Sequence, residues 1–103
     1  MIYCFDIDGT LCSNTFGKYK MAKPISKRIK IVNKLYKNGH TIKLFTARGS
    51  TTNLNWRALT ESQLLQWGVK YHSLELGKPE ADLYIDDKAI SDKEFFEQNL
   101  DYI

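Results

Sequence analysis

The stretch CFDIDGT, residues 4–10, decides the fold class and raises the first question about function. Residues 2–7 are apolar apart from Asp6, which is typical of a buried strand. At the end of this strand Asp6 and Asp8 stand one residue apart, with a glycine directly after them. Like charges this close repel each other, and burying an uncompensated carboxylate costs free energy. We therefore expect a compensating cation near this pair.

Length and composition indicate a single globular domain over residues 1–103. The chain is 43% hydrophobic and 26% charged, whereas disordered chains combine little apolar content with a high net charge. No apolar run approaches the roughly 20 residues of a membrane span, and the first residues lack the pattern of a signal peptide. Cys4 and Cys12 match no disulfide or zinc spacing. We expect a cytoplasmic protein with reduced cysteines and no membrane partner.

Charge is distributed unevenly along the chain. Between Gly9 and Thr60 there are eleven basic residues and no carboxylate, whereas from Glu61 onward ten acids face four lysines. Such polarity favours anionic partners. We favour the interpretation that most of the lysines form the solvated face of a helix, because the segment lacks the interleaved aromatic residues of a nucleic-acid stacking platform. A basic stripe that binds nucleic acid is the second interpretation.

Strand-like and helix-like stretches alternate along the chain. Strands are expected over residues 2–7, 41–47, 69–75 and 82–87. Helices are expected over residues 25–40, 51–68 and 91–99. In the second of these helices, the expected buried face consists of Leu54, Leu59, Leu64, Leu65 and Trp67. Alternation of this kind implies right-handed crossovers, and so predicts an α/β fold with a parallel sheet and helices on its faces.

Polar residues mark the ends of three of the expected strands. They are Asp6 and Asp8 in the first, Thr46 and Arg48 in the second, and Asp86 and Asp87 in the last. A parallel α/β sheet binds its ligand outside the carboxyl ends of the strands, so we expect these side chains to converge. The aspartates would repel one another unless a cation joined them, and Mg²⁺ suits a few carboxylates with waters and a phosphate oxygen. The sequence thus predicts a Mg²⁺ site, and the alternative is a surface turn that merely ends the first strand.

The motifs DIDGT, FTAR, GKP and YIDD occur in this order and together resemble the four motifs of the haloacid dehalogenase superfamily. The resemblance covers nearly the whole chain. More narrowly, TIKLFTARGS, QLLQWGVKYHSLELGKP and ADLYIDDKAI resemble the small phosphatases found with bacterial capsule and surface-polysaccharide genes. The resemblance implies a three-layer Rossmann-like core with a mainly parallel sheet and a short flap. It implies no cap domain, since too few residues separate the motifs.

The resemblance also assigns catalytic roles. Asp6 is the nucleophile that becomes an aspartyl phosphate, and Asp8 is the general acid and base. Residues i and i+2 of a strand point the same way, so Asp8 would stand beside the group that Asp6 attacks. Thr46 supplies a phosphate-binding hydroxyl. Lys78 supplies the cation that steadies Asp6 and the transferring phosphoryl group.

Further residues are placed around the substrate and the metal. Those expected near the substrate are Gly9, Thr10, Ala47 and Arg48. Gly9 lets the chain turn sharply, and Arg48 either reaches the substrate or lies at the surface. Asp86 fits a metal-ligand position, with Asp87 as a second ligand or an outer partner. The short flap falls on residues 13–24, whose Lys18, Tyr19 and Lys20 either contact substrate or only solvate the loop.

Three functions follow as hypotheses. The first is a Mg²⁺-dependent phosphomonoester hydrolase for a small phosphorylated sugar, polyol or amino alcohol in capsule or surface-polysaccharide biosynthesis. The second is a nucleic-acid end phosphatase, which we favour less, and the third is an inactive module that binds a phosphometabolite. Capless relatives borrow a lid from an oligomeric neighbour or accept substrates too large to enclose. Whether this chain forms a homo-oligomer in which a neighbouring subunit supplies the lid is therefore left as an open question.

Overall fold

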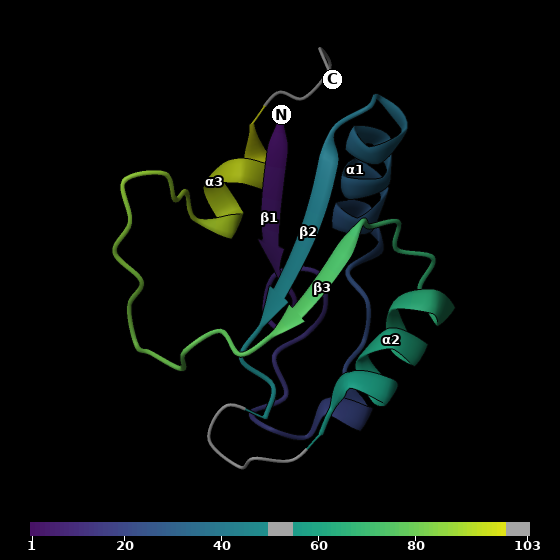
Figure 1. Ribbon diagram of the computed structural model, residues 1–103, viewed down its shortest axis with the longest axis vertical. Coiled ribbons are helices and arrows are strands. Elements are labelled where there is room, and N and C mark those ends of the chain that lie inside the picture. The colour runs from purple at the N-terminus through teal and green to yellow at the C-terminus, as the bar shows by residue number, and fades with distance from the viewer. Residues whose placement is uncertain (50–54, 99–103) are drawn as a thin grey trace.

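The computed structural model describes residues 1–49 and 55–98, and Figure 1 shows how their helices and strands are arranged. The strands are β1 (Ile2–Asp6), β2 (Thr41–Thr46) and β3 (Ser73–Leu76). The helices are α1 (Ser26–Lys37), α2 (Arg57–Gln66) and α3 (Asp92–Glu97), with a 3₁₀ turn η1 (Tyr19–Met21). In this part of the chain the strands form one parallel sheet in the order β1-β2-β3. The expected α/β fold with a parallel sheet and a Rossmann-like core is confirmed.

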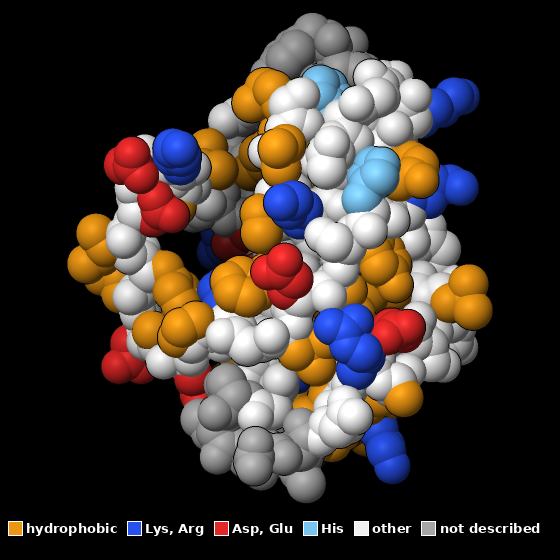
Figure 2. Space-filling model, viewed as in Figure 1, with side chains coloured by type: hydrophobic (Ala, Val, Ile, Leu, Met, Phe, Trp, Pro, Cys, Tyr) orange, Lys and Arg blue, Asp and Glu red, His pale blue; other side chains and the backbone are white. Residues whose placement is uncertain are grey.

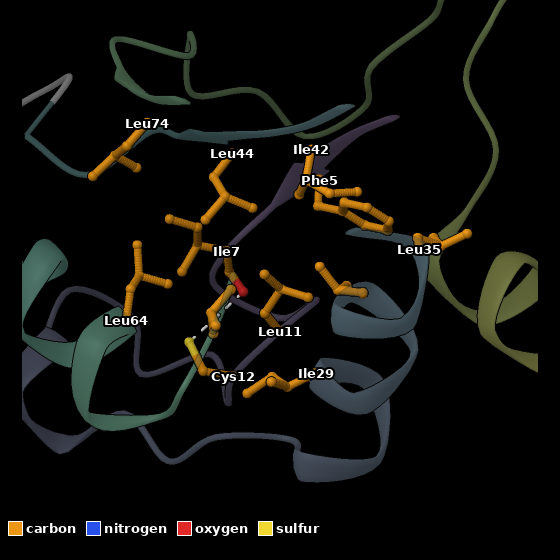
Figure 3. Packing of buried hydrophobic residues seen from close by; sticks show 12 residues of the cluster. Phe5, Ile7, Leu11, Cys12, Ile29, Leu35, Ile42, Leu44, Leu64 and Leu74 are labelled. Carbon is orange, nitrogen blue, oxygen red and sulfur yellow. Dashed lines mark hydrogen bonds between the residues drawn. The ribbon is translucent and has the colours of Figure 1, made fainter. Parts of the chain in front are cut away.

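One face of the sheet carries the hydrophobic core. Phe5 lies opposite Leu44 in the register of β1 and β2, and Leu44 lies opposite Leu74 in the register of β2 and β3. Figure 3 shows these side chains pointing from the sheet toward α1 and α2. The core consists of Phe5, Ile7, Leu11, Cys12, Ile29, Val32, Leu35, Ile42, Leu44, Leu64, Val69 and Leu74.

All three described helices cover this same face. On α3, Phe95 and Phe96 pack against the ring of Phe5, and Asp92 forms a 2.7 Å ion pair with Arg28 of α1. The described residues thus form two layers, where three were expected. The reason lies in the strand order. Right-handed crossovers that always step in one direction put their helices on one face, and covering the second face requires the order to reverse.

The expected strand over residues 82–87 is wrong. The chain from Gly77 to Ser91 runs as a loop, and residues 79–90 are all exposed. In Figure 1 this loop swings away from β1 at the left of the view. Asp86 Oδ1 accepts a hydrogen bond from the backbone N–H of Lys88 at 3.0 Å, so the aspartate makes a local turn. That local bond competes with strand pairing, for which aspartate is poorly suited.

Two other expected elements differ in extent. The third strand starts at Ser73 instead of residue 69, because Val69 N–H donates to Leu64 O and closes the end of α2. Residues 51–54 of the expected second helix lie outside the described residues, and α2 itself begins at Arg57. The expected inner face of this helix is wrong at Leu65, which is 83% exposed. Two polar residues of the same helix, Thr60 and Gln63, are buried instead.

The flap between β1 and α1 has a closed base. Ser13 N–H donates to Lys23 O and Ile25 N–H donates to Leu11 O, both at 2.8 Å. Beyond this base the segment contains the 3₁₀ turn η1. Among residues 1–49 and 55–98 there is no helix with the length and apolarity that a membrane crossing needs.

Two adjacent leucines of α2 test this packing. Leu64 is fully buried, so Leu64→Ala is expected to lower the free energy of unfolding by about 2–5 kcal/mol, because it leaves a cavity. Leu65→Ala makes the same change at an exposed position and is expected to stay within about 0.5 kcal/mol of the parent. Denaturant unfolding followed by circular dichroism measures both. Equal losses would contradict the helix orientation described above.

Candidate active site

Asp6 is the last residue of β1, and its carboxylate faces a lysine. Alternation from the buried Phe5 places Asp6 on the uncovered face of the sheet, where its side chain is 32% exposed. Lys78 Nζ lies 3.5 Å from Asp6 Oδ1. Burial raises the pKa of Asp6, and the positive charge of Lys78 opposes that rise. Asp6 is thus a partly open carboxylate beside a cation.

The end of β2 holds Lys78 in this position. The backbone N–H groups of Gly77 and Lys78 both donate to the carbonyl oxygen of Thr46, each at 3.1 Å. Gly77 has φ +117°, in the region that favours glycine, so the chain turns there directly after β3. The ammonium of Lys78 also lies 4.1 Å from the centroid of the Tyr84 ring, as in a cation–π contact.

Asp8 is held by a different cation. Arg48 Nε donates to Asp8 Oδ2 at 2.8 Å, and Arg48 Nη2 donates to Asp8 Oδ1 at 2.9 Å. This bidentate geometry is among the strongest that a carboxylate makes in proteins. Because β1 ends at Asp6, strand alternation does not fix the direction of Asp8. Its charge still raises the pKa of Asp6, so the two carboxylates are neighbours that pair with separate cations.

Arg48 lies inside the protein, so of its two expected places the surface position is wrong, and contact with substrate stays a prediction. The residue is 2% exposed. Its Nη1 atom donates to Thr60 Oγ1 at 3.0 Å and to Gln63 Oε1 at 2.6 Å. A guanidinium stays charged when it is buried and must therefore be surrounded by acceptors. Asp8 supplies part of this set and α2 supplies the rest, which explains why Thr60 and Gln63 face inward.

A tight turn after Asp8 completes this end of the sheet. Gly9 has φ +82°, which confirms the expected sharp turn. The backbone N–H groups of the three residues after it all point to Ile7 O, at 2.8–3.3 Å. Within the turn, Cys12 Sγ donates to Asp8 Oδ1 at 3.5 Å. The turn therefore positions Asp8 through both backbone and side-chain contacts.

The other residues expected near a substrate lie at the same end of the sheet. Thr46 is 1% exposed, and its Oγ1 accepts the backbone N–H of Arg48 at 3.1 Å. Ala47 follows it and is half-buried. The carbonyl oxygen of Thr10 accepts a hydrogen bond from Arg28 Nη1 at 3.1 Å. Contact of these residues with a substrate stays a prediction.

Asp86 and Asp87 are not brought to this place. Both lie on the exposed loop between β3 and α3. Figure 2 shows this loop at the left of the view, where an opening separates the loop from the body of the protein. The backbone N–H of Lys88 and the side chain of Asp87 lower the pKa of Asp86. The expected convergence of four aspartates is therefore not found among the described residues.

The donor set fits a magnesium ion in part. Mg²⁺ in proteins uses one or two carboxylates together with waters and substrate phosphate. Asp6 supplies one partly open carboxylate, whereas both oxygens of Asp8 accept hydrogen bonds from Arg48. Within residues 1–49 and 55–98, no three His, Cys, Asp or Glu side chains come close enough together to hold a metal ion. Metal ligation by Asp8, Asp86 and Asp87 stays a prediction.

Comparisons with known proteins support the fold. No protein-family model matches the chain, and no curated protein matches it. The chain is similar to a structural genomics target from Vibrio cholerae, with a TM-score of 0.86 and 27% sequence identity over 98% of this chain and 91% of that one. It is also similar to a chain in the structure of the Pnkp1/Rnl/Hen1 complex, with a TM-score of 0.59 and 21% identity. That match covers 94% of this chain but 33% of the other, and shows a shared fold alone.

Sequence reasoning missed the residues that surround Arg48. Thr60 and Gln63 carry no motif and lie between apolar residues of α2, and Tyr19 lies in the flap. Two polar residues three apart on a helix lie on one face, and both fall in the turns next to Leu64. That spacing was a usable signal for a buried polar partner.

The two cysteines provide a test of the packing around Asp8. Both are free, with Cys4 exposed and Cys12 buried. Burial, together with the negative charge of Asp8, raises the pKa of Cys12 to about 12. Only about 1 in 10⁴ molecules would then carry a Cys12 thiolate at pH 8, and the thiolate is the form that reacts. In a thiol titration of the folded protein we expect one cysteine to react, and the second only in denaturant.

Cys4→Ser is the control for this titration. It should remove the reactive thiol of the folded protein and leave the one that needs denaturant. Rapid labelling of Cys12 in folded Cys4→Ser protein would contradict the buried, proton-bearing thiol described here.

Proposed function

We propose that the chain is a phosphomonoester hydrolase of the haloacid dehalogenase superfamily, which works with Mg²⁺ through an aspartyl-phosphate intermediate. The observation that supports it most is the difference between the two carboxylates of DIDGT. Asp6 is partly open beside the ammonium of Lys78, whereas Asp8 is held by the buried Arg48. Neighbouring carboxylates in unlike environments are the usual basis for dividing the roles of nucleophile and acid–base.

The reaction uses Asp6 and Asp8 in turn. Asp8 enters the reaction with a proton taken from solvent. A carboxylate oxygen of Asp6 attacks the phosphorus atom, the bond from phosphorus to the ester oxygen breaks, and the leaving alkoxide takes that proton from Asp8. Asp8 then takes a proton from a water molecule as that water attacks the phosphorus of the aspartyl phosphate. The bond to Asp6 breaks, phosphate leaves, and both carboxyl groups return to their starting state.

The remaining residues hold charge and geometry. Lys78 balances the carboxylate of Asp6 and the oxygens of the transferring group, which carry most of the charge in phosphoryl transfer. Thr46 fixes the turn that carries Lys78, through its carbonyl oxygen. A bound Mg²⁺, held by Asp6 with Asp86 or Asp87, would supply further positive charge against the phosphate oxygens.

The substrate class rests on the narrower resemblance. The proposed substrate is a small phosphorylated sugar, polyol or amino alcohol of capsule or surface-polysaccharide synthesis, and the proposed compartment is the cytoplasm. The lysines of α1 are all exposed along the helix, as both a solvated face and a nucleic-acid stripe require, so the substrate screen has to separate the two. A phosphate-release screen with sugar, polyol, amino-alcohol, nucleotide and 3′- or 5′-phosphorylated oligonucleotide substrates tests the class. Release from oligonucleotides alone, weakening steeply with salt, would replace the proposal by an end phosphatase.

The nucleophile gives the sharpest mutational test. Asp6→Asn is expected to lower phosphate release by more than about 10³-fold, because an amide cannot form the acyl phosphate. Asp8→Asn is expected to lower it by about 10²–10⁴-fold, the usual contribution of a general acid. Glu97→Gln makes a matched carboxylate-to-amide change at an exposed position of α3 and should leave the rate unchanged. Full activity of Asp6→Asn would rule out the mechanism, and inactivity of the parent protein with every substrate would favour a binding module.

Ligation of Mg²⁺ by Asp86 or Asp87 together with Asp6 requires the loop over residues 77–91 to move. Asp86 and Asp87 lie on this exposed loop, so either can join Asp6 at a metal only if the loop approaches the end of β1. We expect Mg²⁺ with a phosphate mimic to protect the loop from limited proteolysis, and a chelator to abolish both protection and turnover. Of Asp86→Asn and Asp87→Asn, the variant that raises the required Mg²⁺ concentration more marks the direct ligand. Unchanged Mg²⁺ dependence in both would contradict the site.

A further inference from the structure

Arg48 is the largest fully buried side chain of the described protein, and every one of its side-chain N–H donors has an acceptor. Nε and Nη2 donate to Asp8. Nη1 donates to Thr60 and Gln63, and Nη2 also lies 4.0 Å from Cys12 Sγ. A buried charge is tolerated only when it is paired and hydrogen-bonded in this way. The guanidinium is therefore fixed in position and orientation.

The same guanidinium contacts the flap. Its carbon atom Cζ lies 4.7 Å from the centroid of the Tyr19 ring, in a cation–π arrangement. Gln63, which accepts from Arg48, donates from its Nε2 to the carbonyl oxygen of Tyr19 at 2.7 Å. The Tyr19 ring also packs edge-on against Trp56 at 5.0 Å, next to the start of α2. A displacement of Tyr19 therefore alters the surroundings of Arg48 on two sides.

We propose that Arg48 is a positioning residue that fixes the Asp8 carboxylate for proton transfer and couples it to the flap through Tyr19 and Gln63. This inference rests on the proposed function. A carboxylate that pairs with Arg48 through both oxygens carries no proton. Before it can act as the acid, Asp8 must take a proton from solvent on one oxygen, and that oxygen then turns from the guanidinium to the leaving group. Arg48 keeps its partners on α2 and its stack on Tyr19 while that oxygen turns. The flap thereby controls how readily Asp8 meets the substrate.

The leaving group of the substrate separates positioning from simple structural support. Loss of a phosphate ester needs proton donation when the leaving group is a basic alkoxide, but hardly any when it is an acidic phenol such as p-nitrophenol. For Arg48→Lys, which keeps the charge and loses the planar fork, kcat/KM for glycerol phosphate is expected to fall by about 10²-fold or more. The fall for p-nitrophenyl phosphate should stay below about tenfold. Equal falls with both substrates would overturn the inference.

A second pair of variants covers the case in which Arg48→Lys does not fold. Tyr19→Ala removes the ring over the guanidinium from a partly exposed position, and Tyr19→Phe keeps it. Tyr19→Ala is expected to lower the ratio of alkyl to aryl kcat/KM, whereas Tyr19→Phe should preserve that ratio. Equal ratios in the two variants would overturn the coupling to the flap.

Combination with Asp8→Asn completes the test. Once Asp8 is an amide there is no acid to position, so Arg48→Lys or Tyr19→Ala should change the alkyl-to-aryl ratio little further in that background. Fully additive effects would show that Arg48 acts independently of Asp8 and would overturn the inference. Parent activity with either substrate tests the proposed function, whereas the ratio in the variants tests Arg48. A parent protein that turns over neither substrate would overturn both.

Discussion

The bidentate ion pair between Asp8 and the buried Arg48 is the interaction on which the rest of this site depends. Two carboxylates one residue apart cannot share an apolar strand end without compensation. The protein supplies a separate cation for each, with Lys78 after β3 for Asp6 and Arg48 after β2 for Asp8. These two cations give the neighbouring carboxylates unlike surroundings, and a metal ion at the same pair stays a prediction.

The parallel sheet makes this arrangement possible. Each of its strands ends at the same edge, so residues distant in sequence reach DIDGT from two directions. Thr46 connects the two cations. Its carbonyl oxygen accepts from the turn that carries Lys78, and its hydroxyl accepts from the backbone of Arg48. A helix that supplies polar side chains to the interior then completes the shell around the guanidinium.

Sequence alone was sufficient where the signal is local. The alternation of strands and helices follows from short-range patterns of apolar residues. At the start of α3, Glu94 N–H donates to Ser91 Oγ at 3.2 Å, which is a local cap. The strand over residues 82–87 failed because Asp86 makes a local turn that composition does not reveal. The burial of Arg48 could not be predicted, since its acceptors come from two segments, the turn after β1 and helix α2, whose approach depends on the whole fold.

Trapping the intermediate tests the central claim most directly. The protein is mixed with Mg²⁺ and a phosphomonoester that it turns over, quenched in acid within a single turnover, digested, and examined by mass spectrometry. Our interpretation predicts one phosphoryl group on the peptide that contains Asp6, lost on brief treatment with hydroxylamine, which cleaves acyl phosphates. Turnover without any phosphorylated peptide, or with the phosphoryl group on another residue, would contradict it.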